Sequence, residues 1–186
     1  MNILNLRPKE FQLVGILLLM FFSISVVSIT GATVRDAVFL IEFNKTYLSM
    51  MYVVIAIIIA FIIEGYKKLI TEKTQISLMM TSSGFFTLSL FVFHYNLNGW
   101  MIPLFYVWIE IITVLTILQF WMLCGELLNT RQAKRIFPII TAGGSLAAIS
   151  TGLFMRSFVN EYGSHNLIIL TIASLILSLV TLQLLK

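Results

Sequence analysis

The sequence predicts an all-α membrane protein: a bundle of six transmembrane helices forming a single domain over residues 1–186. Three observations lead to this fold class: 59% of the residues are hydrophobic, only 11% are charged, and the mean hydropathy is +1.00. A soluble domain carries about 25% charged residues. The excess of apolar residues therefore needs an apolar solvent, which is the lipid bilayer.

Six hydrophobic runs are long enough to cross a membrane. A helix rises about 1.5 Å per residue and the hydrocarbon core is about 30 Å thick, so one span needs about 20 apolar residues. No run carries more than two formal charges, and the loops between the runs are short. The expected spans are about 11–33, 47–65, 76–95, 101–127, 137–158 and 165–185.

The first run resembles a signal peptide because Arg7 and Lys9 precede it. From Phe11 to Thr33, however, it is longer than the apolar part of such a peptide, and no clear small-x-small cleavage site follows. We therefore expect this run to be retained as the first span.

The basic residues predict how the spans are oriented. With the N-terminus inside, nine Lys and Arg residues fall in cytoplasmic segments and three in outer segments, which accounts for all twelve. This bias satisfies the positive-inside rule, and six spans return the C-terminus to the cytoplasm. We expect a multi-pass protein of the bacterial inner (plasma) membrane. Because topology explains the net charge of +4, no nucleic-acid partner is expected.

The two longer cytoplasmic loops, 64–73 and 127–135, alternate basic with polar residues. Their expected role is to set the topology and to attract anionic membrane lipid. A cytoplasmic gate is the alternative. The basic residues in question are Lys67, Lys68, Arg131, Lys134 and Arg135.

Small residues recur every four positions in the fifth run, at Gly144, Ala148 and Gly152, with Gly143 beside them. They form a flat strip on one helix face, where another helix can approach closely. The strip predicts a tight crossing with a second span, or alternatively a sliding surface for a moving helix. Pro138, read as the start of this span, is harmless there because its missing N–H needs no partner.

Glu110 is the most informative residue of the fourth run. It lies about eight residues, or about 12 Å, into the span. An ionised carboxylate at this depth is costly, so it should face the protein interior or water. Tyr106 and Thr113 share its helix face. The stripe predicts a substrate, ion or proton site, or alternatively a hydrogen-bonded carboxyl that only fixes helix packing.

Arg35 and Asp36 close the first run, on a polar edge shared with Ser25, Ser28 and Ala32. They end at the outer interface, or they lie within a longer helix that continues toward Phe43, in which case Arg35 points into a cavity. The residues leave both alternatives open. The Arg35 guanidinium suits an anionic group because its fork donates two hydrogen bonds.

No signature of an enzyme or a cofactor site is found. The sequence lacks a Walker A loop, GxGxxG, HExxH and GxSxG. Its single cysteine, Cys124, makes neither a disulfide nor a zinc site, and His94 and His165 are far apart in sequence. We expect no catalysis, no metal and no cofactor.

The block from Tyr106 to Leu153 resembles the bacterial and plastid nucleotide (ATP/ADP) translocase family and its major-facilitator-like relatives. The aromatic–Glu pattern, the basic segment 132–135 and the Ala-Gly-Gly that follows carry the resemblance, together with Arg35-Asp36. Translocases carry a Lys two residues after that Arg-Asp pair, where this chain has Val38.

The resemblance implies one six-helix half of a two-half transporter, with Arg35 and Glu110 on the cavity side and the basic loops as cytoplasmic gates. Transport then requires a homodimer or a second six-span half, and implies an anionic small-molecule substrate. The alternatives are a non-transporting membrane scaffold or subunit, which grips a partner through the small-residue face, and a truncated inactive fragment.

Overall fold

The computed structural model describes residues 10–70 and 74–185 and, within them, consists of six α-helices without a β-strand. All six helices are long and apolar enough to cross a membrane, in agreement with a multi-pass integral membrane protein. In chain order they are α1 (Phe11–Glu42), α2 (Thr46–Ile70), α3 (Gln75–Asn96), α4 (Met101–Leu127), α5 (Thr130–Tyr162) and α6 (Leu167–Gln183), with a short 3-10 turn, η2 (Ser164–Asn166), before α6.

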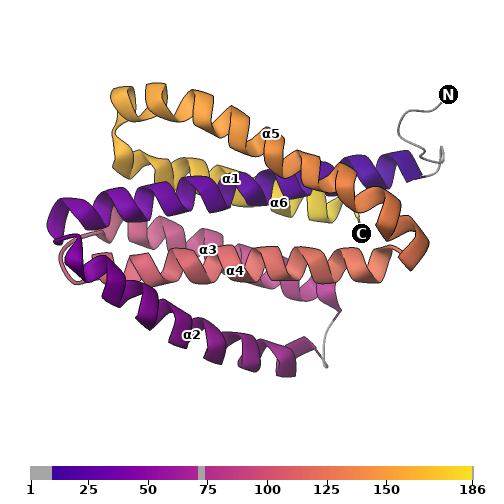
Figure 1. Ribbon diagram of the computed structural model, residues 1–186, viewed down its shortest axis with the longest axis horizontal. Coiled ribbons are helices and arrows are strands. Elements are labelled where there is room, and N and C mark those ends of the chain that lie inside the picture. Colours follow the sequence, from indigo (N-terminus) through magenta and orange to yellow (C-terminus); the bar gives the residue numbers. More distant parts are fainter. Residues whose placement is uncertain (1–9, 71–73, 186) are drawn as a thin grey trace.

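The helices lie side by side and run alternately in opposite directions (Figure 1). α1 begins and α6 ends at the same end of the bundle, which we call the terminal end; α1 ends and α4 begins at the other, the far end (Figure 1). α1 packs against α4, α5 and α6, while α3 packs against α4 and α6. α1 is therefore the central helix of the bundle.

Two helices lie at opposite margins of the bundle and diverge from it, α2 below and α5 above in Figure 1. In its most hydrophobic window α2 has only 6% of its residues buried, whereas α6 has 50%. Val53, Ile57 and Phe61 of α2 are exposed. Such a continuous apolar surface needs lipid or another protein to cover it.

The apolar core forms one cluster toward each end of the bundle. The far-end cluster includes Phe39, Phe105 and Ile112, and the terminal-end cluster includes Met20 and Phe120. The charged groups described below lie beside the far-end cluster.

Helix bounds depart from the expected spans where charges or capping groups lie at the ends. α1 continues nine residues past Thr33 to Glu42, because charged side chains lower hydropathy without breaking a helix. α5 begins seven residues before the expected 137, since Asn129 and Gln132 form a reciprocal capping box. Pro138 therefore lies inside α5, which corrects its expected place at the helix start.

α5 crosses α1 closely through small residues. Gly143 is buried, and a Cβ atom built on it would lie 2.7 Å from the Leu18 carbonyl oxygen of α1. The expected strip is rotated from this contact, because Ala148 is exposed and Gly152 has no neighbour within 4 Å of such a Cβ atom. The buried small face is Gly143 and Ala147, with Gly144 half-buried beside it.

Candidate functional site

Arg35 lies on the buried face of α1, next to α4. Because α1 continues as a helix to Glu42, Arg35 does not lie at a helix end but seven residues before it. Its side chain is only 8% exposed. Of the two alternatives that the sequence left open, the structure therefore has the longer helix with an inward-facing arginine.

Arg35 pairs with an acid of another helix. Its Nη1 forms an ion pair with Oε2 of Glu110 on α4, and its Nε lies 3.3 Å from Oδ1 of Asp36. The Glu110 side chain is 27% exposed and that of Asp36 is 40% exposed. The guanidinium is therefore the buried member of the cluster, and the two carboxylates lie on its more open side.

Tyr106 completes this group, which we call the Arg35 cluster: Arg35, Asp36, Glu110 and Tyr106. The guanidinium carbon lies 4.7 Å from the centroid of the Tyr106 ring, in cation–π geometry. Tyr106 is fully buried, and its hydroxyl lies near Asp36 and Tyr52 without meeting hydrogen-bond geometry to a described residue. A buried polar atom without a partner is unusual and marks a place where a donor or acceptor can bind.

α2 borders the cluster through an aromatic contact. The ring of Tyr52 lies 6.5 Å from that of Tyr106, edge to face. Because α2 packs mainly against α4 and is otherwise exposed, this side of the cluster is closed by the least packed helix of the bundle.

Thr113, which was expected on the same stripe, is half-buried. Among the described contacts, no hydrogen bond, ion pair or ring contact joins its side chain to the cluster; its carbonyl oxygen accepts a hydrogen bond from Thr116. The structure thus brings four of the five predicted substrate or coupling residues together and leaves Thr113 beside them.

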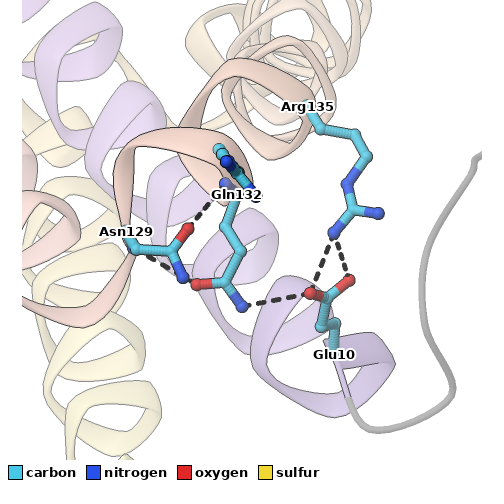
Figure 2. A pocket seen from close by; sticks show the side chains of 5 residues that line it. Glu10, Asn129, Gln132 and Arg135 are labelled. Carbon is cyan, nitrogen blue, oxygen red and sulfur yellow. Dashed lines mark hydrogen bonds and ion pairs between the residues drawn. The ribbon is translucent and has the colours of Figure 1, made fainter.

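A second polar group joins α1 to α5 at the terminal end (Figure 2). Arg135 donates from Nη2 to both carboxylate oxygens of Glu10, at 2.9 and 2.7 Å, and Gln132 donates to the same carboxylate at 3.0 Å. These residues line a cavity of about 410 Å³ together with Asn129 and Arg131. Arg135 is therefore a structural tie between helices in this conformation.

The other basic residues of the expected cytoplasmic gate are placed differently. Lys68, Arg131 and Lys134 are exposed. Lys67 lies in α2, but its side chain is outside the described part of the structure. Among these five basic residues, the ion pair between helices that the structure describes is the one that Arg135 forms with Glu10.

Sequence reasoning missed two pairings. Glu10 was overlooked because an acid among basic flanking residues resembles an ordinary span boundary. His94 and His165 stack with ring centroids 4.9 Å apart, and His165 Nε2 lies 3.0 Å from the His94 carbonyl oxygen, which links the end of α3 to η2. No local signal could have paired two histidines 71 residues apart.

No metal site is apparent in the part of the chain that the structure describes, because no three His, Cys, Asp or Glu side chains gather there. Comparisons of the chain with protein families, with curated proteins and with solved structures found no match. The Arg35 cluster must therefore be interpreted from its own geometry.

Proposed function

We propose that this protein is a secondary transporter-like membrane protein, in which the Arg35 cluster is the substrate and coupling site. The observation that carries the proposal is the ion pair between the buried Arg35 of α1 and the partly exposed Glu110 of α4, inside two membrane-length helices. Charged side chains within such helices are costly, face the protein interior or a water-filled cavity, and commonly mark ion or substrate pathways.

The mechanism we propose is alternating access with a second six-span unit, either a second copy of this chain or another protein. Transport sites of this type lie near the midplane between two halves that rock against each other. The partly open carboxylates of Asp36 and Glu110 and the exposed apolar face of α2 support such a partner. No nucleotide hydrolysis is required, because the gradient of a coupling ion drives the movement.

The substrate class we propose is an organic anion, with nucleotides included by the family resemblance. Arg35 would supply the counter-charge, and its planar fork matches carboxylate and phosphate groups. Val38, where translocases carry a lysine, is buried in the apolar core. The missing cation favours anions of low charge over polyphosphates.

The proposed setting is the bacterial inner membrane with both termini in the cytoplasm. The count of basic residues supports this orientation. The terminal end would then face the cytoplasm, which places the Glu10–Arg135 tie at the cytoplasmic opening. That tie would act as one of the cytoplasmic gates.

Reconstitution tests the proposal. Purified protein in liposomes should take up labelled organic anions or nucleotides, and Arg35→Gln should abolish uptake. Lys45→Gln is the matched control, because Lys45 is an exposed cation in the loop after α1 and should leave uptake unchanged. Absence of uptake for every anion tested, with the oligomer intact, would exclude the transporter.

A second candidate is a membrane scaffold that grips another membrane protein. Ala148 and Gly152 support it, because these small residues lie on the outward side of α5 and leave room for a foreign helix. A photoreactive side chain at position 148 should then crosslink to one stable partner. Crosslinking to lipid alone would exclude this role.

A further inference from the structure

The charges of the Arg35 cluster do not balance. Arg35 is its one cation, and both Asp36 and Glu110 contact the guanidinium. With all three groups ionised the cluster carries one net negative charge. An arginine that is held by two carboxylates is not free to bind a substrate anion, so the arrangement in the structure is a closed form of the anion site.

The surrounding helices offer no further cation in contact with these acids. Within the described residues, α3 and α6 contain no Asp, Glu, Lys or Arg, and α2 faces the cluster with the neutral Tyr52. α5 contributes Arg156, which lines a separate cavity with Thr33, and no ion pair with either carboxylate is seen. The surplus negative charge therefore has to be met by something that binds there.

A single proton meets both needs of the cluster. A protonated carboxyl group has one O–H donor, whereas the ionised form only accepts hydrogen bonds. The buried Tyr106 hydroxyl lies near Asp36 and meets hydrogen-bond geometry to no described residue. A proton on the cluster would cancel the surplus charge, and a protonated carboxyl group could donate a hydrogen bond within the cluster.

We propose that the Arg35 cluster is a proton-gated anion site, in which protonation of Glu110 releases Arg35 to bind the anionic group of the substrate. This inference rests on the proposed transport function. The proton comes from water and forms an O–H bond on the Glu110 carboxylate. The ion pair with Arg35 is lost, and the guanidinium instead donates hydrogen bonds to a carboxylate or phosphate of the substrate.

The step leaves the net charge of the cluster unchanged. One proton and one monoanion add no net charge, so the loaded and the empty cluster both carry one negative charge. When the anion leaves, Glu110 loses its proton and pairs with Arg35 again. The substrate class is therefore a monoanionic carboxylate or phosphate, taken up with one proton per molecule.

Uptake into liposomes at several pH values tests the inference. In the wild type, an inward proton gradient should drive concentrative uptake of the anion with one proton per anion. The apparent affinity should improve about tenfold per pH unit as the outer pH falls toward protonation of the site. Labelled acetate, lactate and inorganic phosphate serve as the probes.

Two variants separate gating from structure. Glu110→Gln mimics the protonated form and should give anion exchange that no longer depends on pH or on a proton gradient. Glu161→Gln, an exposed acid near the end of α5, is the matched control and should behave as wild type.

The outcomes distinguish the two proposals. Anion uptake that is lost in Arg35→Gln but is independent of pH in the wild type would overturn the proton-gated site and leave the transporter standing. No uptake at any pH would overturn both. If Glu110→Gln fails to fold, proton movement accompanying anion uptake by the wild type still decides the question, and anion uptake without it contradicts the proposal.

Discussion

Gly143 of α5 lies directly against the backbone of Leu18 on α1, so close that a Cβ atom on the glycine would be 2.7 Å from the leucine carbonyl oxygen. Gly144 beside it is also close to α1, but its Cβ would lie 2.8 Å from the ring of Phe21, a side chain that can shift. Backbone oxygens cannot move aside as a flexible side-chain end can. The close crossing of α1 and α5 therefore requires a residue without a side chain at position 143.

Gly143→Ala should destabilise the protein by about 1–3 kcal/mol, the usual cost of forcing an extra carbon into a packed contact. Gly152→Ala is the control on the same helix, because nothing lies within 4 Å of its Cβ position. Thermal unfolding in detergent compares the two. Equal stability of the two variants would contradict the close crossing.

Thr30 and Thr171 tie α1 to α6 in the interior, with their hydroxyl oxygens 2.8 Å apart. Thr30→Val should cost about 0.6–2 kcal/mol, the range for hydrogen bonds between membrane helices. Thr33→Val is the matched control, because among the described residues its hydroxyl donates to the Ile29 carbonyl of its own helix and to no other helix. A double-mutant cycle with Thr171→Val measures the coupling, and additive effects would argue against the bond.

Glu10 and Arg135 should contribute to stability at the terminal end. Glu10→Gln removes the charge that accepts two hydrogen bonds from Arg135, and should cost about 1.5–3 kcal/mol, as expected for hydrogen bonds to charged groups. Arg131→Gln serves as the control, because Arg131 is an exposed residue that lines the same cavity. Chemical unfolding in detergent gives the comparison, and similar losses in both variants would count against the tie.

Arg35→Gln should be more damaging to stability than the loss of both members of the pair. The single change leaves the Glu110 carboxylate without its cation and should cost about 3–5 kcal/mol. The double variant Arg35→Gln/Glu110→Gln should recover much of this loss, because no unpaired charge remains at the α1–α4 contact. Unfolding of the four proteins in one cycle checks the prediction, and a double variant as unstable as the sum of both singles would refute it.

The two ends of the bundle should lie on opposite sides of the membrane. Asn98→Cys, in the far-end loop, should react with an impermeant thiol reagent from outside, and Arg131→Cys only after the membrane is permeabilised. Cys124 is fully buried, so the wild type should show no background labelling. Labelling of both positions from one side would require a different number of crossings.

The sequence by itself determined the helices. A chain segment in lipid must satisfy its own backbone hydrogen bonds, so an apolar run of sufficient length forms a helix whatever its neighbours are. The fourth span, expected at 101–127, is α4 at Met101–Leu127. The prediction was less accurate for α1, because hydropathy falls at Arg35 and Asp36 while the helix continues to Glu42. Hydropathy measures the free energy of transfer into lipid, and it does not report the residue at which a helix ends.

Only the tertiary structure decided which side chains meet. Arg35 and Glu110 are far apart in the chain and could each have been paired elsewhere or solvated; the packing of α1 on α4 joins them. The same holds for the small residues of α5, where the packing against α1 includes Gly143 and leaves Gly152 outside the contact. The rotation and tilt of a helix depend on the summed contacts with several neighbouring helices. The energy of a buried charge depends on the groups that lie next to it. The local sequence contains neither the contacts nor the neighbouring groups.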